Sequence, residues 1–523
     1  MNFRFLSNIR FRGLPILVFM LPLLALSQTN SQSQNPGSAA YQSQSVLRAT
    51  TRLVILDVVV TDDKGNPVPD LKAEDFTVLE DGKPQQLIDF SFQHPTTSAQ
   101  NAPKLAPNVV SNIPTYSSAS SLNVILLDAI NTDFSSHAYA QEMLIKYLES
   151  GPAIQPTAVY ALEARLRLLH DFTTDTRELR DVVAHFKPQG PTHIPDVYSA
   201  ATPFSRRGSF QVSDQGRNAT FNSMRFLARA LSGYPGRKNL IWLSEAFPLS
   251  LFPETTMGEG AFLVVDFSPA MERVADELMN AQVALYPIDA AGVSINDRFP
   301  ARTGMLSMSE RTGGKTFYNR NDIDLGVRTS INDGSTYYNM QYYPQNKQWD
   351  GRFRKIEVKV NRPGIQLRYR QGYFALAPDS RSMPSTATSA HDLGTALAPE
   401  APGSAAVLFQ AAVDPPVKGQ SKILVKFGID PHTIAFRQSE DGMEHAAIDC
   451  VVWAYKGGDQ PAQTEAHSVN ADLDPKVYAE VMKSYLPCST TVELKHGEYN
   501  LRLGVIDQQT KLIGSLGVKL VVP

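Results

Sequence analysis

The chain has 523 residues, which is enough for two to four domains at about 150 residues per domain. Hydrophobic residues make up 42% of it and charged residues 19%, a composition that suits globular domains and excludes a largely disordered chain. The formal net charge is −3 at pH 7, so no broad basic field is available to attract nucleic acid, and we expect no nucleic-acid partner.

Residues 1–27 have the pattern of a signal peptide. A basic start with three arginines precedes the apolar stretch Leu14–Leu26, and Ala25-Leu26-Ser27 offers small residues for cleavage. A bilayer-spanning helix needs about 20 apolar residues, so we expect cleavage, with an uncleaved signal anchor as the alternative. No later run is apolar enough to span a membrane. We therefore expect an exported protein, periplasmic or extracellular, without a transmembrane segment after signal cleavage.

Residues 28–93 contain a leader and a small β unit. Residues 28–50 are rich in Ser, Gln and Asn, which predicts a flexible leader. Leu53–Val60 is apolar and β-branched and predicts a strand, and a hairpin is expected around Asp81-Gly82. The β unit of residues 51–93 is too small to bury a core by itself. We hypothesise that it pairs with a later β stretch at residues 335–375.

Strands and helices alternate over residues 122–334, after an expected linker, rich in Pro, Ser and Asn, at residues 94–121. Strands are expected at residues 124–127, 240–243, 283–288 and 316–318, with one or two more within 159–169. Helices are expected at residues 136–148, 175–186, 219–231, 270–281 and 305–312. This alternation predicts a mostly parallel α/β sheet that is covered on both faces.

The β pattern returns after residue 334. Strands expected at residues 337–343, 355–360 and 366–373 make up the β stretch of residues 335–375. Residues 376–403 are rich in Ser, Thr, Ala and Pro and are expected to form a second linker. Short strands separated by turns then predict a β-sandwich over residues 404–523.

Cys450 and Cys488 are the two cysteines of the chain, and both lie in the C-terminal region. An exported chain reaches a compartment where disulfides form, so a bridge between them is expected, with two separate buried thiols as the alternative. Neither cysteine lies in a CxxC or Cys-His pattern, which argues against a catalytic thiol.

Several motifs within residues 53–374 resemble the von Willebrand factor A-related proteins first noted in Acidobacteria. They are DVVVTDDKGNPV, LKAEDFTVLEDGKPQ, PGRKNLIWLSEAFP, YPIDAAG, TGGKTFYNRND and WDGRFRKIEVKVNRPGIQLRYRQGYF. The resemblance implies a doubly wound, Rossmann-like von Willebrand A domain with a ligand site at the carboxyl ends of its strands. Together with the β patterns, the expected fold is this α/β domain flanked by all-β sandwich-type domains.

In the wider von Willebrand factor A family, that site holds Mg²⁺ or Mn²⁺. The ion is held by an Asp-x-Ser-x-Ser loop, a Thr from a second loop and a later Asp, and a hard divalent ion prefers such oxygen ligands. Ile130 stands where the first Ser is expected and offers no ligand, and the last acid is a Glu. The resemblance therefore implies a degenerate Mg²⁺ site, with the matching residues Asp128, Thr132, Thr192 and Glu245.

Asp128 and Thr132 have an alternative interpretation that needs no metal. They lie where an apolar strand ends and a helix is expected to begin. In such a turn their side chains would satisfy backbone N–H groups, and an acid near a helix N-terminus is favourable by roughly 0.3–1 kcal/mol. Under this interpretation Glu245 is a solvated loop acid.

We interpret the chain as a non-enzymatic binding protein. No P-loop, His-Glu-x-x-His or GxSxG motif is present, and no nucleophile with a neighbouring base is evident. The expected function is protein–protein binding or adhesion, with an unidentified protein partner, through the loops near Asp128, Thr132, Thr192 and Glu245. The alternatives are a structural envelope or surface-assembly protein without metal binding and, less favoured, a hydrolase of envelope polymers.

Overall fold

The structure is a computed structural model, and all of its described residues belong to one compact unit within residues 44–523. The signal peptide and leader expected at residues 1–50 lie outside the described residues, as does Thr192. The described residues are 53–94, 105–114, 116, 121–150, 155–188, 206–245, 254–258, 261–265, 268–293, 299–375 and 386–523.

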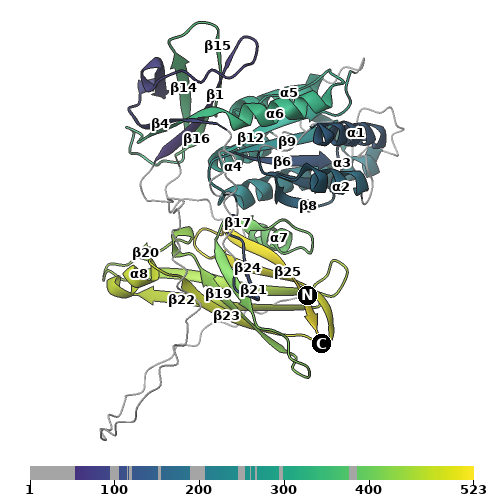
Figure 1. Cartoon of the computed structure of the whole chain (residues 1–523), viewed down its shortest axis with the longest axis vertical. Helices are drawn as coiled ribbons and strands as arrows, with labels where there is room; N and C mark the ends of the chain where they lie inside the picture. The colour runs from purple at the N-terminus through teal and green to yellow at the C-terminus, as the bar shows by residue number, and fades with distance from the viewer. Residues whose placement is uncertain are drawn as a thin grey trace, which may run out of the picture. The chain divides into compact units, whose positions relative to one another are not determined.

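A five-stranded sheet forms the centre of the α/β domain (Figure 1). All neighbouring strands are parallel except the edge strand β8, which is antiparallel to β7. Numbered along the chain, the strands read 3-2-1-4-5 from that edge, the doubly wound order that places the first strand centrally. The spatial order is β8 (Leu166–Thr173), β7 (Thr157–Leu162), β6 (Ser121–Asp128), β9 (Arg237–Ser244) and β12 (Val283–Asp289).

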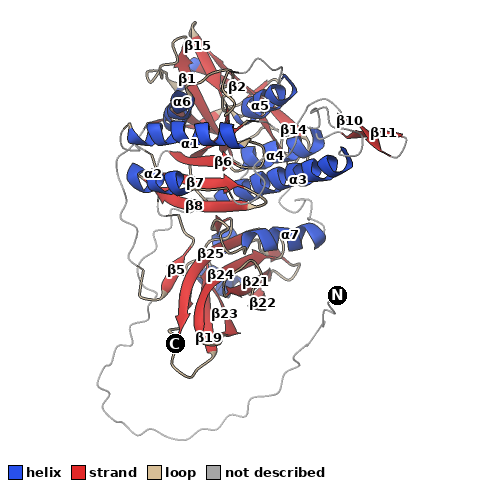
Figure 2. Cartoon of the chain, turned by 90° about the vertical axis from the view of Figure 1, so that its right-hand side faces the viewer, coloured by secondary structure: helices blue, strands red, loops and turns tan. Residues whose placement is uncertain are grey.

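Helices cover both faces of this sheet (Figure 2). One face packs against α3 (Arg206–Leu231), α4 (Ser268–Asn280) and α5 (Phe299–Thr312), and the other against α1 (Phe134–Glu149), α2 (Thr176–His185) and α6 (Ile323–Ser335). A hairpin of β10 (Glu254–Gly258) and β11 (Ala261–Val265) follows β9.

The central strand β6 shows why the sequence folds this way. Val124 and Leu126 point into the core on the α3 side, whereas Ile125 and Leu127 point into the core on the α1 side. A strand that is buried on both faces needs an unbroken apolar run, and the residues from Val124 to Leu127 supply it.

Residues from both sides of the α/β segment build the first β domain. In one sheet, β1 (Val54–Asp62) pairs with β13 (Tyr337–Tyr342) and β15 (Ile365–Arg368), and β13 pairs with β4 (Leu87–Gln93). In the other, β14 (Phe353–Val360) pairs with β2 (Phe76–Glu80) and β16 (Gly372–Phe374), and β2 pairs with β3 (Lys83–Pro84). The two sheets share one core, so the α/β domain is inserted between two halves of a β domain.

A buried carboxylate connects these two halves. Glu80 lies on β2 and is 2% exposed. Its Oε2 accepts hydrogen bonds from the hydroxyls of Tyr342, at 2.9 Å, and Tyr373, at 2.8 Å, and its Oε1 forms an ion pair with Arg354. All three partners come from the later half of the domain, so this network holds the chain segments on either side of the insertion together.

The C-terminal domain also consists of two sheets that share one core. The first has the order β17 (Ser404–Ala405), β25 (Ile513–Val522), β24 (Gly497–Asp507), β21 (Glu444–Tyr455) and β20 (Arg437–Gln438), with β22 (Gln463–Leu473) paired to β21. The second has the order β23 (Leu486–Glu493), β19 (Lys422–Ile429), β18 (Phe409–Val413) and β5 (Val109–Ser111). A short helix, α8 (Pro475–Val481), connects β22 to β23.

Both expected linkers contain regular structure, which corrects the sequence interpretation at these residues. β5 lies within residues 94–121 and pairs with β18, and Asn112 holds it in place by accepting a hydrogen bond from the Phe409 N–H. α7 (Thr386–Ala396) lies within residues 376–403, and Leu397 directly after it is buried. Composition predicted a linker at residues 94–121 because it does not show that a short segment will pair with a distant strand. At residues 376–403 it does not show that a segment rich in small residues will form a helix beside a buried leucine.

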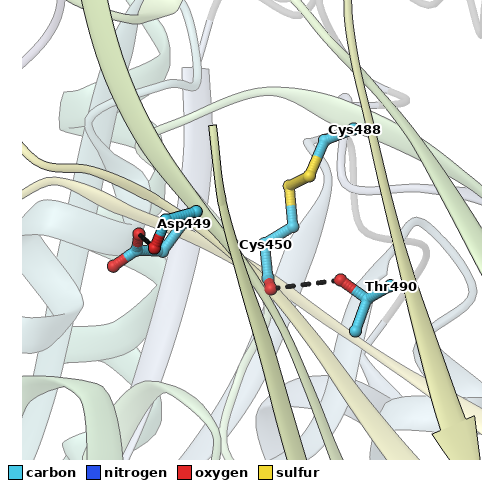
Figure 3. Close-up of a disulfide and its surroundings, with 5 residues drawn as sticks. Asp449, Cys450, Cys488 and Thr490 are labelled. Atoms are coloured by element: carbon cyan, nitrogen blue, oxygen red, sulfur yellow. Dashed lines mark hydrogen bonds between the residues drawn. A yellow bond between two sulfur atoms is a disulfide. The ribbon is translucent and has the colours of Figure 1, made fainter. Parts of the chain in front are cut away.

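A disulfide joins Cys450 of β21 to Cys488 of β23 and so connects the two sheets of the C-terminal domain (Figure 3). Beside it, the Thr490 hydroxyl donates a hydrogen bond of 3.3 Å to the Cys450 carbonyl. The two cysteines are 38 residues apart in the sequence. Of the two alternatives that the sequence left open, the structure has the bridge.

We predict that opening this disulfide will destabilise the C-terminal domain. A closed loop of this length stabilises the folded state by about 4 kcal/mol in the chain-entropy model. A Cys450→Ala/Cys488→Ala variant should therefore lose about that much free energy of unfolding, measured by urea denaturation. Wild-type protein unfolded under reducing conditions should match the variant, and equal stability of the oxidised and reduced proteins would contradict the prediction.

Lys238 is a buried cation at the amino end of β9. It is 1% exposed, and its ammonium donates a hydrogen bond of 2.8 Å to the Tyr234 carbonyl. Burial lowers the pKa of Lys238 to about 7, and Asp57 opposes the shift only in part. The unfolded chain binds this proton more tightly than the folded chain does, so stability rises with pH from about 7 to the ordinary lysine value near 10.5.

We predict that Lys238→Met will stabilise the protein near pH 7 by about 2–4 kcal/mol, because it removes the desolvated ammonium. The gain should shrink as the pH rises from about 7 to 10.5, because the folded chain loses this proton near pH 7 and the unfolded chain loses it near pH 10.5. Urea denaturation across this pH range measures both effects. The exposed Lys519→Met is the control and should change stability little at any pH; a gain from Lys238→Met that does not depend on pH would contradict the burial argument.

Candidate functional site

The loops at the carboxyl ends of the parallel strands meet at one edge of the central sheet. The Ala290 N–H after β12 bonds the Ser244 carbonyl at the end of β9, and the Asp289 N–H bonds the Phe317 carbonyl. The Ala129 N–H after β6 bonds the Leu162 carbonyl at the end of β7. We call this region the carboxyl edge; it is where open α/β sheets generally bind ligands.

Asp128 lies at the centre of the carboxyl edge and accepts five hydrogen bonds. Its Oδ1 accepts the backbone N–H groups of Ile130, at 3.0 Å, and Asn131, at 2.9 Å. Its Oδ2 accepts the Asn131 amide at 2.8 Å, the Trp242 indole N–H at 3.0 Å and the Ser244 hydroxyl at 2.8 Å. A carboxylate offers about four acceptor positions, so these donors saturate it.

The side chain of Asp128 is 1% exposed, and its network reaches three elements. Burial raises the pKa of Asp128 above its ordinary value, and the hydrogen bonds from Asn131, Ser244 and Ile130 act in the opposite direction by favouring the carboxylate. Asn131 also donates to the Thr220 hydroxyl on α3 at 3.0 Å. The network thus fixes the loop after β6 to β9 and to α3.

Thr132 and Glu245 form a second connection across the same edge. The Glu245 N–H donates to the Thr132 hydroxyl at 3.1 Å, and the Glu245 carboxylate accepts the Asp133 N–H at 2.9 Å. Asp133 is the N-cap of α1 and accepts the Ser136 N–H at 2.7 Å. Acceptors at this position satisfy backbone donors of the first helical turn, which explains why α1 begins at Phe134.

The structure brings together three of the four site residues that the resemblance indicated: Asp128, Thr132 and Glu245. Thr192 lies outside the described residues. Trp242, Ser244 and Thr220 were not predicted as site residues, because an indole, a strand-end serine and a helical threonine carry no motif of their own. The motif that contains Trp242 and Ser244, NLIWLSE, was the available signal.

The arrangement does not fit direct Mg²⁺ coordination by Asp128. A cation in contact with this carboxylate would have to displace the Trp242 or Asn131 N–H groups, which occupy the positions that a metal would take. Among the described residues, no group of three His, Cys, Asp or Glu side chains is placed to hold a metal ion. The Mg²⁺ prediction stays a prediction, and the hydrogen bonds favour the alternative for Asp128, which accepts the Ile130 and Asn131 N–H groups of the turn. Thr132 instead accepts the Glu245 N–H, and Glu245 is not a solvated acid, since its carboxylate accepts the Asp133 N–H.

The outer surface of the carboxyl edge carries apolar side chains. They follow β6, β12 and Phe317, and they are Phe134 (73% exposed), Val293 (59%), Tyr318 (42%) and Leu325 (43%). Asn321 connects the loops that carry them, because its side chain accepts the Val293 N–H at 2.9 Å and its carbonyl accepts the Tyr139 hydroxyl of α1 at 2.5 Å. We call these four residues the edge apolar residues.

Solved structures that are similar to this chain include several von Willebrand factor A proteins. A von Willebrand factor type A protein from Catenulispora acidiphila is 10% identical, with 84% of this chain and 74% of that chain covered and a TM-score of 0.23. The von Willebrand factor domain of the type V pili tip protein Mfa5 from Porphyromonas gingivalis is 14% identical, with 41% and 96% covered and a TM-score of 0.24. The ArnB paralog VWA2 from Sulfolobus acidocaldarius is 7% identical, with 90% and 75% covered and a TM-score of 0.20.

No protein-family model matches the chain, and no curated protein matches it. The strand order and the helices on both faces of the sheet agree with the doubly wound α/β fold that the resemblance implied.

We predict that Asp128→Ala will lower the free energy of unfolding by about 3–5 kcal/mol, because it leaves buried N–H and O–H donors without an acceptor. Asp322→Ala is the control: Asp322 is half-exposed and ion-paired with Arg320, and its loss should cost about 1 kcal/mol or less. Urea denaturation of the wild type should be the same in Mg²⁺ and in EDTA. Stabilisation by Mg²⁺ that disappears in Asp128→Ala would contradict this interpretation and support the metal site.

Proposed function

We propose that this chain, whose central domain has a von Willebrand factor A-like fold, is an exported protein that binds a protein partner through the carboxyl edge of that domain. Binding is independent of a metal ion, and the central domain is not catalytic. The edge apolar residues carry the proposal, because exposed aromatic and aliphatic side chains on a rigid surface are the usual anchors of a protein interface.

Two features support the edge as a binding surface. The Asp128 and Glu245 hydrogen bonds fix the loop that leads to Phe134, and the Asn321 side chain bonds the Val293 N–H, so little conformational entropy is lost there when a partner binds. The edge apolar residues also come from separate loops that Asn321 connects. Binding sites are frequently built from loops that a rigid scaffold positions in this way.

Two observations support export. The N-terminal sequence has the basic start, short apolar core and small residues of a signal peptide. The Cys450–Cys488 disulfide is typical of proteins that fold in an oxidising compartment. None of the described helices is long and apolar enough to cross a membrane.

We predict that Phe134→Asp combined with Leu325→Asp will weaken partner binding by about 30-fold or more, which corresponds to the loss of at least one anchor worth about 2 kcal/mol. Both positions lie in the first turn of a helix, where an acid is favourable, so the folded state should be preserved. The measurement is affinity capture from an envelope extract of the source organism, followed by titration of the captured protein against each variant.

Val521→Asp is the matched control, because Val521 is 64% exposed but lies in the C-terminal domain. It should retain the captured protein, and EDTA should not change capture by any variant. Capture of the same protein by wild type and by the Phe134→Asp/Leu325→Asp variant would contradict the proposal. It would favour the structural alternative, in which contacts are made by the β domains.

A further inference from the structure

Three side chains of the C-terminal domain form a serine–histidine–aspartate chain. The Ser439 Oγ lies 2.9 Å from His445 Nε2, and His445 Nδ1 lies 2.6 Å from Asp472 Oδ1. A nucleophile within hydrogen-bond reach of a base, which is itself oriented by a carboxylate, is the arrangement of nucleophilic catalysis in acyl transfer. Such a set is recognised by geometry and not by order along the chain.

Three elements of the C-terminal domain bring these residues together: the turn after β20, and the strands β21 and β22. Ser439 begins the tight turn between β20 and β21, which is closed by the bond from the Gly442 N–H to the Ser439 carbonyl at 3.0 Å. His445 is the second residue of β21, and Asp472 lies directly opposite it in the register of β22. A cross-strand pair therefore aligns the histidine and the aspartate, and the turn brings the serine to the other side of the ring.

We propose that Ser439, His445 and Asp472 form an acyl-transfer site that accepts carboxylic esters. His445 takes the proton from the Ser439 hydroxyl as the oxygen attacks the ester carbonyl, and it returns that proton to the departing alkoxide. The bond from Ser439 Oγ to the acyl carbon forms and the bond to the alcohol breaks. Water then hydrolyses the acyl-serine, so one ester and one water give one acid and one alcohol.

The backbone beside Ser439 supplies a donor for the developing oxyanion. The Glu440 N–H, directly after the nucleophile, donates to no acceptor among the described residues. A backbone N–H at this position is the usual donor to the negative oxygen of a tetrahedral intermediate. The site is open, since the side chains of His445 and Asp472 are 39% and 67% exposed. It therefore suits an ester group displayed on an extended polymer better than an enclosed small molecule.

Asp441 competes with His445 for the serine proton. The Ser439 hydroxyl also donates to the Asp441 carboxylate, and this hydrogen bond is the largest cause of the lowered pKa of Asp441. A carboxylate so close to Ser439 also repels the developing oxyanion. Asp441 therefore lowers the nucleophilic reactivity of Ser439. Removing this acid should increase that reactivity, which an accidental surface contact would not predict.

The test is covalent labelling of the full chain with a fluorophosphonate probe, located by peptide mass spectrometry. The serine oxygen displaces fluoride from phosphorus and His445 takes the proton. We expect one adduct on Ser439, absent in Ser439→Ala. Labelling should be about 100-fold slower in His445→Gln, which lacks the base, and at least about 10-fold slower in Asp472→Asn, which no longer orients it. In Asp441→Asn labelling should be faster than in wild type.

Ser468→Ala is the matched control, because the hydroxyl of Ser468, on β22, likewise bonds a carboxylate, that of Asp449, at 2.6 Å. It should label as wild type does, and hydrolysis of p-nitrophenyl acetate should follow the same order across the variants. Thermal unfolding checks that each variant is folded. No adduct on Ser439, or equal rates in wild type and His445→Gln, overturns the proposal. Loss of labelling in Asp441→Asn also overturns it, because that result makes Asp441 the base.

Discussion

The buried carboxylate of Asp128 is the interaction on which the α/β domain depends. It places a full charge where water cannot reach it, which is costly unless donors surround the charge. The five donors come from the turn after β6 and from β9, and one of them, the Asn131 amide, also bonds α3. The hydrogen bonds that Asp128 requires therefore also fix the geometry of the carboxyl edge. They hold the loop after β6 against β9 and α3.

The same kind of interaction holds together the two halves of the first β domain, between which the α/β domain is inserted. Glu80 is buried in the first β domain, and its partners Tyr342, Tyr373 and Arg354 all come from the chain beyond the insertion. An insertion separates two halves that must find each other over a long stretch of chain, which costs chain entropy before their strands can pair. A buried acid that is satisfied only by residues of the other half disfavours any other pairing.

Much of the fold could be predicted from the sequence, because the spacing of apolar residues along a segment indicates which of its faces are buried. The apolar run before Asp128 predicted a strand covered on both faces, and the small size of residues 51–93 motivated the pairing with residues 335–375 that the strands show. Helix α6 was missed, although Ile323, Val327 and Ile331 are buried at helical spacing. The strand β5 was missed because its three residues acquire a partner only from β18, far along the chain.

The location of the candidate site could be predicted from the sequence, but the role of its acidic residues could not. The motif located Asp128, Thr132 and Glu245 at one edge, since that follows from strand order, but whether an acid holds a cation or a hydrogen-bond network depends on neighbours that no spacing shows. Trp242 is one such neighbour, because its indole N–H donates a hydrogen bond of 3.0 Å to Asp128 Oδ2. The serine–histidine–aspartate chain was not predicted for a related reason: the register of β21 and β22 places Asp472 opposite His445, and the sequence does not show that register. A sequence limits which groups are present, and the folded backbone determines which of them meet.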